Sequence, residues 1–221
     1  MKDVGKEQDL MLKNIKVSQL VKIIVGTLLV ALGITLMITS QLGVDTLSVA
    51  LFGVMNFIPW KFGYLTLFFN LIILAFAVFF DRQQVGLGSF ANAFGVGLTV
   101  NALTPILTAS EFLTSHTYLT MILGIVVYGL GVGIYVAGNL GSAAVECLTM
   151  MVVKATKFPL RYVRISLDAL MVVIGLLLGS QSFGIGTIIC VITTGLIMER
   201  VLVFFERLEQ KAQRNLISQT K

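Results

Sequence analysis

Charged side chains are scarce in this 221-residue chain, since Asp, Glu, Lys and Arg together make up only 12% of it. A soluble domain carries about a quarter charged residues, so this chain has too little polar surface to face water on all sides. Hydrophobic residues make up 57% of the sequence and the mean hydropathy is +0.94. The shortage of charge excludes an ordinary soluble domain and indicates a membrane protein.

Histidine and cysteine are also scarce. The single histidine, His116, rules out a histidine pair or an HExxH motif within the chain. Cys147 and Cys190 lie in apolar surroundings without CxxC spacing, so we expect buried thiols and not redox or metal chemistry. No G-x-S-x-G or phosphate-binding loop motif occurs. We therefore expect no enzyme activity, no catalytic residue, no cofactor and no metal.

Long uncharged stretches dominate what is present. A helix of about 20 apolar residues crosses a bilayer, and five stretches of 19 to 30 residues carry no charge: 23–44, 62–80, 83–110, 117–145 and 169–198. Ten of the 16 Lys and Arg residues lie before the first stretch or after the last. Such basic ends are typical of cytoplasmic segments, so we expect both termini in the cytoplasm and no nucleic-acid partner despite the net charge of +5.

Glycines coincide when the chain is shifted along itself by 98 residues. Six coincidences occur between 26–101 and 124–199, where chance gives about one, which predicts a duplicated unit. We expect a basic cytoplasmic segment at 1–22, one repeat at 23–107, a connecting loop at 108–116, a second repeat at 117–204 and a basic cytoplasmic tail at 205–221.

Each repeat reads as a long span, a short element and two further long spans. The long spans are predicted at 20–40, 61–80, 87–107, 117–138, 160–178 and 186–204, and the short elements at 45–58 and 143–155. At 1.5 Å per residue the short elements do not cross a core of about 30 Å, so we interpret them as re-entrant or half-membrane helices. Six full spans then make the repeats inverted, whereas an eight-span alternative would make them parallel.

Ionisable side chains inside the apolar segments indicate a site. Asp168 lies one turn beyond Arg164, so the two can pair on one helix face, and Asn70 is the counterpart of Asp168 in the first repeat. Asp45 and Glu146 open the two short elements, either as helix caps or beside a ligand. We take all five as candidates for a substrate or ion path, with a structural ion pair and helix capping as the alternatives.

Glycine-rich joints precede the last span of each repeat, at Gly86 and Gly88 in the first and at Gly184 and Gly186 in the second. Three interpretations remain open: close helix approach, tight turns with positive φ, or unwound backbone whose carbonyls line a path. Asn92, in the span after the first joint, fits interhelical hydrogen bonding or a polar cavity.

The second repeat resembles a known family. The runs Arg164-Ile165-Ser166-Leu167-Asp168, Gly175-Leu176-Leu177-Leu178-Gly179 and Phe183-Gly184-Ile185-Gly186-Thr187 are similar to motifs of the YczE/YyaS/YitT family of bacterial membrane proteins, and Leu42-Gly43-Val44-Asp45 resembles its motif after the first span. The resemblance implies a bacterial inner-membrane protein and supplies no substrate.

Together these features predict a permease-like protein with a site between two repeats. Its expected partners are the lipid bilayer, an unidentified small molecule or ion, and further copies of the same chain. The alternative is a non-transporting scaffold or regulator whose basic tails dock another complex or anionic lipid.

Overall fold

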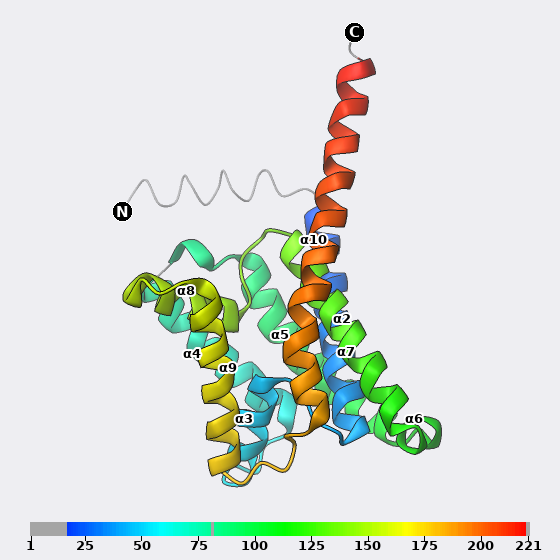
Figure 1. The fold of residues 1–221 in the computed structure, drawn as a ribbon, viewed down its shortest axis with the longest axis vertical. Helices are drawn as coiled ribbons and strands as arrows, with labels where there is room; N and C mark the ends of the chain where they lie inside the picture. The colour runs from blue at the N-terminus through cyan, green and yellow to red at the C-terminus, as the bar shows by residue number, and fades with distance from the viewer. Residues whose placement is uncertain (1–16, 81, 220–221) are drawn as a thin grey trace.

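The computed structural model describes residues 17–80 and 82–219, and within these ranges the regular structure is helical, with no strand (Figure 1). A single 3-10 turn, Arg82–Gln84, joins α4 to α5. The helices are α2 (Val17–Ser40), α3 (Thr46–Met55), α4 (Phe62–Phe80), α5 (Leu87–Thr108), α6 (Glu111–Ser115), α7 (Thr117–Ala137), α8 (Ala144–Thr156), α9 (Leu160–Leu177) and α10 (Ile185–Gln219).

Five of these helices, α2, α4, α5, α7 and α10, are long and apolar enough to cross a membrane. The prediction of an all-α multi-pass membrane protein is therefore confirmed. The one remaining predicted span, 160–178, corresponds to α9, which has 18 residues and is about 27 Å long. It carries Arg161, Arg164 and Asp168 within that length, so its composition does not identify it as a span.

The two short elements are helices as predicted. Helix α3 has 10 residues and α8 has 13, which correspond to about 15 Å and about 20 Å. Both are shorter than the hydrocarbon core of about 30 Å. Their lengths agree with the interpretation as re-entrant or half-membrane helices, and the number of spans stays a prediction.

Helices α2 and α7 pack against each other along a seam of glycines. A Cβ atom on Gly26 would lie 2.5 Å from the backbone nitrogen of Tyr135, and one on Gly33 would lie 2.5 Å from that of Tyr128. From α7, a Cβ on Gly131 would lie 2.5 Å from the nitrogen of Val30. Because residue numbers rise on one helix as they fall on the other, the two helices run in opposite directions.

The glycine joints contact the turns that end α2 and α7, with the partners exchanged between the halves. Gly88 donates its backbone N–H to the carbonyl of Leu140 over 2.8 Å, and Gly186 donates to the carbonyl of Leu42, also over 2.8 Å. A Cβ on Gly86 or Gly184 would lie within 2.3 Å of the same carbonyl oxygens. Close approach is therefore the reason for glycine at the joints.

Of the three interpretations of the joints, tight turns with positive φ are excluded. Among the described residues, the glycines with positive φ are Gly43 (123°), Gly141 (119°) and Gly179 (81°). Gly43 and Gly141 lie in the turns that end α2 and α7 and contact the joints, where the chain must reverse after a long helix. The special backbone conformation is thus in the turn, and the close approach is in the joint that packs on it.

The short helices also pack across the halves: α3 lies against α9, and α8 lies against α4. Two predicted boundaries differ from the structure. Helix α10 continues past the predicted end of the span at 204 to Gln219, because its polar residues keep helical geometry. The predicted loop 108–116 contains the short helix α6. Of the predicted N-terminal segment, residues 1–16 lie outside the described residues, as do residues 220–221 of the tail.

Candidate functional site

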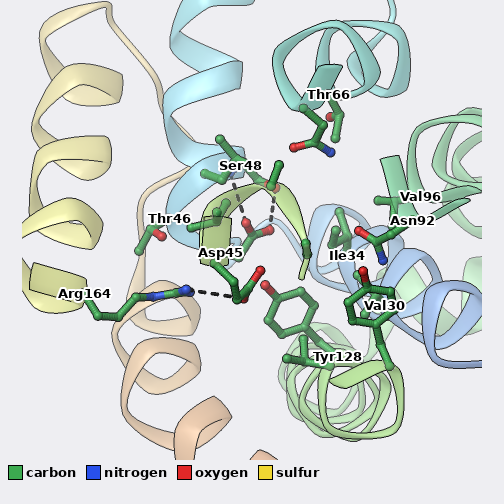
Figure 2. A pocket seen from close by; sticks show the side chains of 18 residues that line it. Val30, Ile34, Asp45, Thr46, Ser48, Thr66, Asn92, Val96, Tyr128 and Arg164 are labelled. Atoms are coloured by element: carbon green, nitrogen blue, oxygen red, sulfur yellow. Dashed lines mark hydrogen bonds and ion pairs between the residues drawn. The ribbon is translucent and has the colours of Figure 1, made fainter. Parts of the chain in front are cut away.

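A cavity of about 80 Å³ lies where the two halves meet (Figure 2). Its 18 lining residues come from α2, α4, α5, α7 and α9 and from the N-terminal ends of α3 and α8. Fourteen of them form pairs 98 positions apart: Val30 and Tyr128, Ile34 and Val132, Asp45 and Ala143, Thr46 and Ala144, Leu47 and Val145, Ser48 and Glu146, and Thr66 and Arg164. The offset found in the glycines therefore recurs in the walls of the cavity.

The first short helix brings a capped N-terminus to the cavity. Asp45 is the N-cap of α3, and its carboxylate accepts hydrogen bonds from the Ser48 backbone N–H over 3.2 Å and from the Ser48 hydroxyl (Figure 2). Asp45 is 8% exposed. Among the described residues no Lys, Arg or His forms an ion pair with this carboxylate. The interpretation of Asp45 as a helix cap is confirmed, and Asp45 also lines the cavity.

The second short helix presents an N-terminus without a side-chain cap. Its N-cap residue is Ala143, the counterpart of Asp45, and Glu146 lies in the first turn. Glu146 does not cap the helix. Its carboxylate instead lies 3.4 Å from an Nη atom of Arg164. The two helix N-termini thus have similar N-cap backbone geometry, but the carboxylate of Asp45 caps its helix whereas that of Glu146 pairs with Arg164.

Arg164 connects three elements around the cavity. Its Nε donates to Asp168 over 3.0 Å, which confirms the predicted pair one turn apart on α9. The other oxygen of Asp168 accepts a hydrogen bond from the Thr46 hydroxyl on α3 over 2.7 Å. The network thus ties both short helices to α9, α8 through the guanidinium of Arg164 and α3 through the carboxylate of Asp168.

Two lining side chains have no hydrogen-bond partner among the described residues. The amide of Asn70 is 7% exposed and lines the cavity from α4. The hydroxyl of Tyr128 on α7 points into the centre of the cavity (Figure 2). Asn92 lines the cavity as well and donates to the Thr27 hydroxyl over 3.3 Å, so it serves both roles considered for it. The polar atoms of Asn70 and Tyr128 are therefore available to an occupant of the cavity.

The structure brings together four of the five predicted site residues, because Asp45, Asn70, Glu146 and Arg164 all line the cavity. Asp168 does not line it and acts through Thr46 and Arg164. The four joint glycines are also absent from its lining. Within the described residues no cluster of three or more His, Cys, Asp or Glu side chains could hold a metal ion.

Sequence reasoning missed the contributions of Tyr128, Tyr135, Thr46 and Thr66 to the lining. A signal existed for two of them. By the 98-residue offset, Thr66 is the counterpart of the candidate Arg164. Thr46 is the counterpart of Ala144, and these two residues begin the two short helices. Tyr128 and Tyr135 carried no such signal, because an aromatic residue in a long apolar stretch is more often packed than functional.

The length and composition of the helices, and a cavity enclosed by several of them, define a multi-pass α-helical membrane protein. Residues 17–202 match the family of unknown function DUF6198, so the chain belongs to that family.

Relatives agree with this class. The chain is similar to the uncharacterized membrane protein YczE of Bacillus subtilis (strain 168), with 26% identity over 78% of this chain and 80% of the relative. It is also similar to the uncharacterized protein YyaS of the same organism, with 25% identity over 83% and 92% of the two chains. An uncharacterized protein of Haemophilus influenzae is 28% identical over 58% and 57%. The resemblance to the YczE and YyaS proteins is confirmed, and no solved structure matches.

Proposed function

We propose that this protein is a small permease of the bacterial cytoplasmic membrane, with both termini in the cytoplasm and a solute site between two inverted repeats. The observation that carries the proposal is the cavity itself. Paired positions of the two halves line it, and both half-membrane helices begin at its wall. Many secondary transporters bind solutes at such a repeat interface, beside the ends of interrupted helices.

The directions of the helices support the inverted arrangement. Helix α2 and its counterpart α7 run antiparallel along their glycine seam, as inverted repeats require. The start of α2 lies near the C-terminal part of α10, where Lys22 Nζ is 4.6 Å from the ring centroid of Phe205 (Figure 1). An even number of crossings returns the chain to the side on which it began.

The test is solute flux in proteoliposomes that contain the purified full-length chain. Uptake of a panel of amines, inorganic ions, organic acids and neutral solutes is compared with uptake into empty liposomes. We expect at least one solute to enter faster with the protein, and Glu146→Gln to reduce that flux at least tenfold, because Glu146 lines the cavity and pairs with Arg164.

The matched control is Glu199→Gln, which also neutralises a carboxylate but lies on α10 outside the cavity lining. Its flux should equal that of the wild type. Identical uptake into protein-containing and empty liposomes across the panel would contradict a permease and favour the scaffold alternative.

A further inference from the structure

We propose that the cavity binds a small organic cation, an amine of a few heavy atoms, with Asp45 as its counter-ion. The inference rests on the proposed function, because it names the solute class for the same cavity. Three properties of the lining carry it: the charge of its carboxylates, its unsatisfied polar groups and the apolar side chains opposite them.

The charges favour a cation. Asp45 is buried, and its described partners are the N–H and hydroxyl groups of Ser48. Arg164, the cation that lines the cavity, is already engaged by Glu146 and Asp168. Asp45, Glu146 and Asp168 therefore place three carboxylates near one guanidinium, which pairs with the last two, and a buried carboxylate without a cation is costly. A positively charged occupant removes that cost, whereas an anion would add to it.

The polar side chains without partners suit an ammonium group. An ammonium group has three N–H donors and no acceptor. The carboxylate of Asp45, the carbonyl oxygen of the Asn70 amide and the hydroxyl oxygen of Tyr128 are three acceptors that line the cavity. Because Asn70 and Tyr128 have no hydrogen-bond partner among the described residues, an ammonium group can donate to the amide oxygen of Asn70 and to the hydroxyl oxygen of Tyr128 without breaking an existing bond.

The opposite wall suits a hydrocarbon. Val30, Ile34 and Val96 lie across the cavity from Arg164 and Thr46 (Figure 2). The volume of about 80 Å³ is about half that of an engineered cavity of about 150 Å³ that binds benzene, which limits the occupant to a few heavy atoms. A hydrated metal ion would leave polar water against this apolar wall, whereas a short alkyl chain would bury its carbon atoms there.

The test is equilibrium binding of propylamine to the purified full-length protein in detergent, measured by calorimetry, with 1-propanol as the neutral counterpart of the same size. We expect propylamine to bind at least tenfold more tightly than 1-propanol at neutral pH, where the amine is protonated. We also expect Asp45→Asn to weaken propylamine binding at least tenfold. Asparagine is an N-cap as good as aspartate, so this variant keeps the cap and removes the charge.

Glu199→Gln, outside the lining, should keep the wild-type Kd for propylamine. Equal Kd values for propylamine and 1-propanol, no saturable binding of propylamine, or an unchanged Kd in Asp45→Asn would each overturn the inference. The amine–alcohol comparison needs no variant, so it holds even if Asp45→Asn fails to fold. Binding is measured without flux, so the two proposals fail separately. Propylamine that binds but is not transported contradicts only the permease, and flux of other solutes without amine binding contradicts only the amine site.

Discussion

At the scale of single residues, the two halves place different chemistry at corresponding positions. Arg164 and Asp168 on α9 form an ion pair, whereas their counterparts on α4 are Thr66 and Asn70. Thr66 donates to the carbonyl of Phe62 within its own helix, and Asn70 has no hydrogen-bond partner among the described residues. Helix α9 therefore carries a charged pair, whereas α4 carries neutral polar groups at the corresponding positions.

Removing the guanidinium should destabilise the protein more than removing the whole pair. In Arg164→Thr, the partly buried carboxylates of Asp168 and Glu146 lose their cation, so we expect a loss of about 1–3 kcal/mol in the free energy of unfolding. The double variant Arg164→Thr/Asp168→Asn, which reproduces the neutral pair of the first half, should recover part of the lost stability. Thermal unfolding of the two variants in the same detergent measures their stabilities. A double variant less stable than Arg164→Thr would contradict this account.

How far the sequence predicts the site also depends on particular residues. The i,i+4 spacing of Arg164 and Asp168 is local, so it predicted their contact. The bonds from Thr46 to Asp168 and from Arg164 to Glu146 join different helices, and no local spacing encodes them. Tyr128 was missed for the same reason, because only the tertiary packing of α7 turns its hydroxyl toward Asp45 and Arg164.

At the scale of elements, glycine contacts hold the long helices together. The seam between α2 and α7 leaves no room for a Cβ atom at Gly33 or Gly131, since each would lie 2.5 Å from backbone of the other helix. Backbone cannot move aside as a flexible side chain can. The period of the glycines predicted a duplicated unit, but it did not predict that each short helix packs on the opposite half, α3 on α9 and α8 on α4.

Alanine at the seam should therefore separate the helices. We expect Gly33→Ala and Gly131→Ala each to reduce the free energy of unfolding by about 1–3 kcal/mol, because of overpacking. Gly195→Ala is the matched control, since no atom lies within 4 Å of its Cβ, and helix propensity should make it neutral or about 0.5–1 kcal/mol stabilising. Thermal unfolding of the three variants measures the difference. Equal midpoints for Gly33→Ala and Gly195→Ala would refute the seam.

The two turns that receive the joints should respond alike to substitution. Gly43 and Gly141 have φ values of 123° and 119°, and a Cβ on either would lie within 2.7 Å of a backbone nitrogen, that of Thr187 or Gly86. Gly43→Ala and Gly141→Ala should each cost about 1–3 kcal/mol through backbone strain and close contact. If the unfolding midpoints of the two variants fall by similar amounts, the two turns are structurally equivalent. A large effect at one turn and none at the other would show that the turns are not equivalent.

At the scale of the whole molecule, the antiparallel seam, the exchanged joints and the paired cavity lining have one common explanation. A unit with an odd number of crossings, followed by a second such unit, enters the membrane from the opposite side and meets its copy about a two-fold axis. Helices α3 and α8 are too short to add a crossing to either unit. In the permease that we propose, the cavity lies at that axis, within reach of both sides of the membrane in turn.

This arrangement predicts which loops face which side. In a variant with Cys147 and Cys190 replaced by serine, single cysteines are introduced by Trp60→Cys, Thr114→Cys or Phe158→Cys, all at exposed positions outside the five candidate spans. With six crossings and a cytoplasmic N-terminus, a membrane-impermeant maleimide should label the first two in intact cells. It should label the third only after permeabilisation. Eight crossings would place position 60 in the cytoplasm. If Trp60→Cys were labelled only after permeabilisation, the inverted repeats would be contradicted, and with them a site at a two-fold axis.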